Sequence, residues 1–135
     1  MIFIFDENLP PSITEALAIF QKRLNKRYKT NHKAEHITNL FKTGTKDPDF
    51  IPKIPSDGIL ITMDIGQQRK WQEKILIEQE MMNVIYYRSK QNLTYWKLVL
   101  LFINSWQDVL EKAESLPKPF LVRYKPEDVR KYARL

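Results

Sequence analysis

The chain has 135 residues, a length that fits one domain able to bury roughly two thirds of its unfolded surface. Its composition, with 43% hydrophobic and 28% charged residues, is that of an ordinary globular protein and excludes a disordered or collagen-like chain. Cysteine is absent, which excludes a disulfide framework, a thiolate metal site and a cysteine nucleophile. The net charge of +6 favours acidic or phosphate-bearing partners. We expect a single domain over 1–135.

The amino terminus has no basic region followed by a long apolar stretch, so we expect no signal peptide and a cytoplasmic location. The longest apolar stretch, 93–110, is interrupted by Lys97, Asn104 and Asp108. It predicts a buried helix, and no association with a membrane is expected.

The first two elements are a strand and a helix. Ile2 to Phe5 form a solid apolar run, typical of a strand that is buried on both faces of a parallel sheet. A helix is predicted over 11–28, because apolar residues recur at helical spacing and Pro11 suits its first turn. Ser12 and Glu15 have the spacing of a capping box.

The middle of the chain continues the alternation of strands and helices. A short strand is predicted around 33–37, a short helix begins at Asp47 and Pro48, and a second apolar run at 59–61 leads to Thr62, Met63 and Asp64. A helix over 67–82 and a buried strand over 83–87 follow.

The last third has a long helix over 94–115 and a strand over 120–124, followed by a short basic helix. The apolar residues of the long helix cover more of its circumference than one sheet requires. This breadth fits either core packing or a surface for homodimer formation. Alternating strands and helices together predict an α/β fold with a parallel sheet covered by helices.

Two of the buried runs end in an aspartate: Asp6 follows the first strand and Asp64 the strand at 59–61. Ligands of parallel sheets bind beyond the carboxyl ends of the strands. If the two strands are neighbours, both carboxylates lie at one rim. Mg²⁺ and Mn²⁺ prefer such oxygen ligands.

A third acid, Asp47, is expected to join Asp6 and Asp64, although its position at a helix start fits an N-cap equally well. Glu7, Asp49 and Glu73 are further candidates. The chemistry that these acids favour is metal-assisted hydrolysis of a phosphodiester, which requires no side-chain nucleophile.

Basic residues are clustered on both sides of these acids in the sequence. Each cluster fits a solvated helix face or a surface that attracts phosphates. The second interpretation predicts RNA binding by Lys22, Arg23, Lys26 and Arg27.

The motifs resemble those of a known family. The segment from Phe5 to Pro11, with Asn8 inside it, the segment 47–52, the strand end 61–64, the Trp-rich helix and the closing 119–122 occur in the order found in PIN-like domains, the ribonuclease fold of VapC-type toxins. The resemblance covers nearly the whole chain. It implies a three-layer α/β/α fold with a mostly parallel central sheet, a pocket holding Mg²⁺ or Mn²⁺, cleavage of RNA, and an antitoxin protein as partner.

Carried over by position, Asp6 and Asp64 match the first and last pocket acids of this family, and Asp47 the middle one. Thr62 corresponds to a small hydroxyl residue that orients a carboxylate or a water. Many members have a basic residue and a further acid after the last aspartate, where this chain has Ile65 and Gly66. The fourth acid, and whether one or two metals bind, therefore stay open, with Glu73 the nearest later acid. Arg69 and Lys70 are expected to supply the cationic contacts to RNA that Ile65 and Gly66 do not.

Two other functions fit parts of the pattern. A catalytically inactive PIN-like module would bind RNA or a protein without cleaving it. A phosphoacceptor receiver domain also places acids after its first strand and an aspartate after a later one, but the prolines after Asn8 have no place in it. His32 and His36 at i, i+4 spacing would suit zinc on a helix, although a third ligand is not evident.

Overall fold

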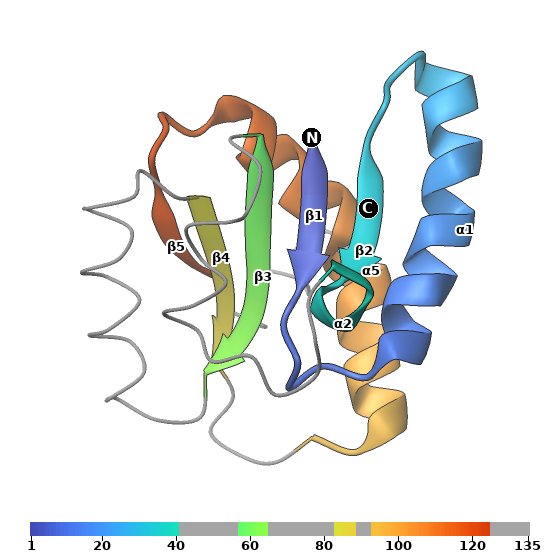
Figure 1. Cartoon of the computed structure of the whole chain (residues 1–135), viewed down its shortest axis with the longest axis vertical. Coiled ribbons are helices and arrows are strands. Elements are labelled where there is room, and N and C mark those ends of the chain that lie inside the picture. The colour runs from blue at the N-terminus through green and yellow to red at the C-terminus, as the bar shows by residue number, and fades with distance from the viewer. Residues whose placement is uncertain (41–56, 65–82, 89–92, 125–135) are drawn as a thin grey trace.

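The computed structural model of the chain describes residues 1–40, 57–64, 83–88 and 93–124. Five strands in these ranges form one parallel sheet (Figure 1). Its spatial order is β2-β1-β3-β4-β5. The strands are β1 (Ile2–Phe5), β2 (Lys33–His36), β3 (Gly58–Asp64), β4 (Asn83–Arg88) and β5 (Leu121–Tyr124).

The solid apolar runs form the centre of the sheet. β1 pairs with β2 on one side and β3 on the other, with Phe5 in register with both His36 and Ile61. Phe3, Ile4 and Phe5 are all fully buried. Because successive side chains of a strand point to opposite faces, burial of all three shows that both faces exclude water. The predicted α/β fold with a buried parallel sheet is confirmed.

Helix α1 (Pro11–Tyr28) has the predicted bounds. The capping-box prediction was wrong: Pro10 is the N-cap residue and has no side-chain capping bond. The two prolines set the helix start, so Ser12 lies inside the first turn and its hydroxyl bonds the Tyr95 hydroxyl at 2.7 Å. The helix ends where Lys29 adopts a left-handed conformation with φ of 54°.

Helix α5 (Tyr95–Ser115) begins after Thr94, whose side chain accepts a hydrogen bond from the Lys97 backbone N–H. Its inner face buries Phe102, Trp106 and Val109. The apolar periodicity predicted the helix but not which of its sides faces the sheet. Large apolar residues on its outer side are exposed, among them Trp96, Leu100 and Ile103.

Helices α1 and α5 cover the same face of the sheet and run in the same direction. Their buried residues share one core cluster with Phe3 and Phe5. Both helices begin at the carboxyl edge of the sheet and return toward its amino edge (Figure 1). No helix among the described residues combines the length and apolarity needed to cross a membrane.

The strand predicted around 33–37 is β2, which leads directly into the short helix α2 (Ile37–Leu40). The strands predicted at 83–87 and 120–124 are confirmed as β4 and β5 with ends shifted by one residue. The helices predicted from Asp47, over 67–82 and after residue 124 lie outside the described residues.

Candidate active site

The connections of β1 create a switch point at the carboxyl edge of the sheet. From β1 the chain passes through α1 to β2 on one side, whereas β3 lies on the other side of β1. In sheets of this kind ligands bind outside the carboxyl ends of the strands where the direction of winding reverses. The residues that follow β1 and end β3 therefore occupy the expected position of a site.

Asp6 follows β1 at this switch point and is 1% exposed. Its Oδ1 accepts a hydrogen bond from the Glu7 backbone N–H at 2.7 Å, and its Oδ2 accepts one from the Thr62 hydroxyl at 2.9 Å. The Asp6 N–H donates to the Ile61 carbonyl at 2.9 Å. Hydrogen-bond donors at both oxygens fix the orientation of the carboxylate.

Thr62 is fully buried in β3 and holds the Asp6 carboxylate across the β1–β3 boundary. The register explains the contact: Phe5 is opposite Ile61, so the next residue of each strand brings Asp6 beside Thr62. A threonine suits this position because its branched side chain packs well in a strand while its hydroxyl donates the bond.

The segment from Asp6 to Pro10 is tied to the end of β2. The Leu9 N–H donates to the Asp6 carbonyl at 3.0 Å. The Leu9 carbonyl accepts a hydrogen bond from Nε2 of His36, at 2.7 Å, and Nδ1 of His36 contacts the Thr38 hydroxyl at 2.7 Å. His36 is 2% exposed and both its ring nitrogens are engaged. It holds the segment after Asp6 against the end of β2, a role that the i, i+4 spacing with His32 did not predict.

Asp64 is the last residue of β3, two positions beyond Thr62. Because β1 and β3 are paired neighbours, Asp6 and Asp64 both occupy ends of adjacent parallel strands, the placement that the two aspartate-terminated runs predicted. Glu7 and Asn8, the supporting candidates next to Asp6, are exposed at the same edge.

The other candidates from the sequence lie outside the described residues: Asp47, Asp49, Glu73, Arg69 and Lys70. Within the described ranges, no three His, Asp or Glu side chains gather as a ligand set. The oxygen donors present at the rim nevertheless fit a hard cation such as Mg²⁺ or Mn²⁺, since a fixed buried carboxylate is the usual anchor of such ions.

The basic candidates on α1 lie away from Asp6. Lys22, Arg23, Lys26 and Arg27 are exposed on its last two turns. They follow Pro11 by 11 to 16 residues, which at 1.5 Å per residue is roughly 16–24 Å along the helix toward the amino edge. Their RNA-binding role remains a prediction and would require a substrate that extends along α1.

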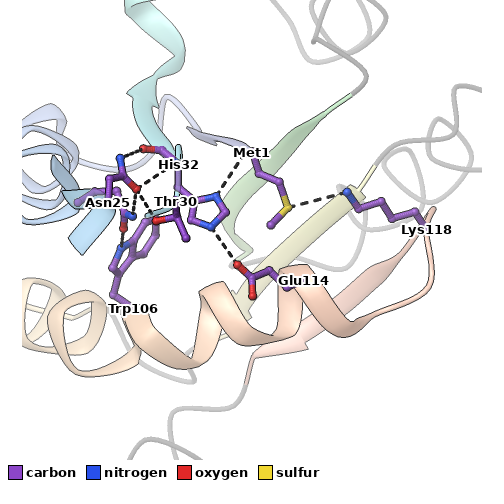
Figure 2. A network of polar contacts seen from close by, with 8 residues as sticks. Met1, Asn25, Thr30, His32, Trp106, Glu114 and Lys118 are labelled. Carbon is purple, nitrogen blue, oxygen red and sulfur yellow. Dashed lines mark hydrogen bonds and ion pairs between the residues drawn. The ribbon is translucent and has the colours of Figure 1, made fainter. Parts of the chain in front are cut away.

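A second polar network lies at the amino edge of the sheet (Figure 2). The Asn25 side-chain oxygen accepts hydrogen bonds from the Gln21 side-chain amide, the Thr30 hydroxyl and the His32 backbone N–H at 2.7–3.0 Å. Its amide donates to the His32 carbonyl at 2.8 Å. Gln21 in turn accepts a bond from the Trp106 indole N–H at 2.9 Å. Asn25 thus joins α1, the segment before β2 and α5.

His32 also belongs to this network. Its Nε2 lies 3.0 Å from Glu114 Oε1, and its Nδ1 lies 3.3 Å from the Met1 amino group. His32 and His36 flank or end a strand instead of sharing a helix face, and their ring nitrogens contact different partners. The zinc interpretation of this pair is therefore wrong.

A family model for the PIN-like domain matches residues 1–87. The chain belongs to the PIN-like domain family. The matched residues run from β1 to Tyr87 in β4 and include Asp6, Thr62 and Asp64. Comparisons with curated proteins and with solved structures give no match. The strand order by itself is shared with flavodoxin-like folds, including receivers, so the family match and not the topology favours a PIN-like domain over a receiver.

Proposed function

We propose that this PIN-like domain is a Mg²⁺- or Mn²⁺-dependent endoribonuclease that hydrolyses RNA phosphodiester bonds at the carboxyl edge of its sheet. Many members of the PIN-like superfamily are nucleases. The observation that carries the proposal is the Asp6 carboxylate, which is buried, fixed by two hydrogen bonds and placed at the switch point beside the end of β3.

In this proposal Asp6, Asp47 and Asp64 hold the metal, with Glu7, Asn8, Asp49 and Glu73 in supporting positions. The metal, when bound, activates a water and stabilises the departing oxygen of the phosphodiester. Asp6 holds its ligand in a fixed direction because Thr62 and the Glu7 backbone N–H restrain both carboxylate oxygens. His36 maintains the path of the chain from Asp6 to Pro10 through the Leu9 carbonyl.

We further propose that the nuclease acts in the cytoplasm as the toxin of a toxin–antitoxin pair. Support comes from the order of motifs that resembles VapC-type toxins and from the basic surface of α1, which suits a polyanionic substrate. A small helical or DNA-binding protein encoded beside this chain would be the antitoxin. Inhibition of RNA cleavage by that protein would establish the pair.

The activity is tested by incubating the purified protein with single-stranded RNA in Mg²⁺, in Mn²⁺ and in a chelator. The wild type should cleave in either metal and not in the chelator. Asp6→Asn should abolish cleavage. Asp57→Asn is the matched control, because Asp57 is an exposed aspartate directly before the opposite, amino end of β3, and this variant should cleave like the wild type.

Two results would contradict the proposal. Cleavage that persists in Asp6→Asn would show that a contaminating nuclease or another site is responsible. RNA binding without cleavage in either metal would instead indicate an inactive RNA-binding module.

A further inference from the structure

The exposed outer faces of α1 and α5 enclose a groove that the nuclease proposal does not use. The groove has a volume of about 530 Å³ and lies between the two helices. Its walls are mostly apolar: Phe20, Leu24 and Tyr28 from α1 face Ile103 and Leu110 from α5. Trp106 and Gln21, together with Thr30 and His32 of the amino-edge network, also line it.

Large apolar side chains on both walls remain in contact with water. Phe20 is 50% exposed, Tyr28 63% and Ile103 44%. On α5 the stripe continues toward the helix start through Leu100, at 54%, and Trp96, at 71%. Apolar residues at i, i+4 and i+7 along a helix are typical of a face that packs against another helix. Exposed apolar surface of this extent indicates an interaction site.

The two sides of the groove carry opposite charges. Arg23 and Arg27 follow Phe20 by three and seven residues, so they lie on the same side of α1, and both are exposed. On α5, Glu111 and Glu114 line the groove and are exposed as well. Among the described residues no ion pair joins these arginines to these glutamates.

We propose that this groove is the interface of a homodimer whose two-fold axis runs parallel to α1 and α5. Such an axis places α1 of one copy against α5 of the second copy without changing the position of a residue along the axis. The contacts between Ser12 and Tyr95, and between Gln21 and Trp106, show that the two helices run side by side in the same direction. The basic end of α1 therefore meets the acidic end of α5 of the second copy.

The charge distribution favours this arrangement over other pairings. An axis perpendicular to the helices would bring α1 against α1 of the second copy, with no acid from α5 opposite its arginines. With the parallel axis, Arg27 of each copy lies opposite Glu111 of the other, so this pair forms twice by symmetry. The apolar side chains of Phe20 and Ile103 then fill the centre of the contact.

The size of the surface is adequate for a specific dimer. A patch as long as the 18-residue α1 measures about 27 Å, and two packed helices are roughly 20 Å wide. Burial of this patch on both copies removes on the order of 1,000 Å² of surface, the lower limit for a specific interface. The same axis makes the carboxyl edges of both sheets face the same direction, so Asp6 of each copy opens to one side of the dimer.

The dimer is tested by light scattering coupled to size-exclusion chromatography over a concentration series. The wild type should be dimeric, and Phe20→Glu and Ile103→Glu should raise the dissociation constant by more than about tenfold. Ile19→Glu is the matched control. Ile19 is 68% exposed and adjacent to Phe20 but does not line the groove, so its variant should remain dimeric.

The orientation is tested with charge reversals that leave the apolar contacts unchanged. Arg27→Glu alone and Glu111→Arg alone place like charges opposite each other, so each variant should be more monomeric than the wild type. Mixing the two variants should form a heterodimer, because both pairs across the interface are then opposite in sign. Melting curves of each variant show whether it is folded.

Three results would overturn the proposal. The first is a wild type that is monomeric at every concentration. The second is a dimer that persists in the folded Phe20→Glu and Ile103→Glu variants. The third is a pair of reversal variants that do not associate on mixing.

Discussion

The two ends of the parallel sheet carry polar networks of different kinds. At the amino edge, Asn25 satisfies three donors and one acceptor of nearby segments. At the carboxyl edge, Thr62 and the Glu7 N–H fix a single buried carboxylate, Asp6. The first network joins α1, the segment before β2 and α5 by hydrogen bonds, so we assign it a role in the stability of the fold. The second orients a charged oxygen donor at a ligand-binding position, as expected of a functional site.

Removal of the Thr62 hydroxyl should produce the largest change at the carboxyl edge short of removing Asp6. In Thr62→Val the Asp6 Oδ2 loses the hydrogen bond from the Thr62 hydroxyl, so the carboxylate is held less firmly in its orientation. Partners that orient metal ligands typically contribute about 10- to 100-fold, so the rate of RNA cleavage should fall by about that factor. Thr62→Ser keeps the hydroxyl and should recover most of the rate; equal losses in both variants would contradict an orienting role.

Removal of the Asn25 side chain tests the other end. In Asn25→Ala the Gln21, Thr30 and His32 groups lose their common partner. The free energy of unfolding should fall by about 1–3 kcal/mol, because partly buried polar groups are left unpaired, as measured by chemical denaturation. The cleavage rate of the folded variant should stay unchanged. A loss of cleavage with no change in stability would reverse the roles assigned to the two ends.

High pH should lower the free energy of unfolding through Tyr87, which is buried in the core between the two ends of the sheet. Burial raises the pKa of Tyr87 far above its usual value, despite the 2.8 Å hydrogen bond to the Ser105 hydroxyl. The unfolded chain releases the Tyr87 proton near pH 10, whereas the folded chain retains it. The contribution of Tyr87 to the free energy of unfolding is therefore constant below that pH and falls as the pH rises further. In Tyr87→Phe the free energy of unfolding, measured by chemical denaturation at pH 9 and above, should fall less steeply with pH than in the wild type. The same pH dependence in both proteins would show that Tyr87 ionises equally in the folded and unfolded states.

The smallest expected effect is at Lys29, the left-handed residue that ends α1. A side chain with a Cβ is disfavoured in that conformation, whereas glycine adopts it readily. Lys29→Gly should raise the free energy of unfolding by about 0.5–1 kcal/mol. Lys26→Gly, inside the helix, is the matched control and should lower it by a similar amount. A lower free energy of unfolding in both variants would contradict this expectation. It would indicate that the added flexibility of the unfolded chain outweighs the relief of the left-handed conformation at residue 29.

Sequence patterns predicted the elements better than the faces they bury. The run from Ile2 to Phe5 identifies a buried strand because all its residues are apolar. In α5, however, Trp96 and Leu100 are as hydrophobic as Phe102 and Trp106, so periodicity alone does not tell the inner side from the outer. Only the position of the sheet decides which of them is buried.

The site was predictable to a similar degree. The strand-end positions of Asp6 and Asp64 follow from the apolar runs and the rules of parallel sheets. The role of His36 does not, because its partner is a backbone carbonyl 27 residues away, a contact that no local pattern encodes. Ser12 illustrates the opposite error: its local capping signal was overruled by Pro10 and Pro11, and its hydroxyl bonds Tyr95 instead.

The most direct test of the central claim is calorimetric titration of the protein with Mn²⁺ in the absence of RNA. The wild type and Asp57→Asn should bind Mn²⁺ with the same affinity and gain thermal stability in its presence, whereas Asp6→Asn should lose both the binding heat and the stabilisation while remaining folded. Binding of Mn²⁺ to Asp6→Asn with wild-type affinity, or no binding to the wild type, would contradict a metal site at Asp6.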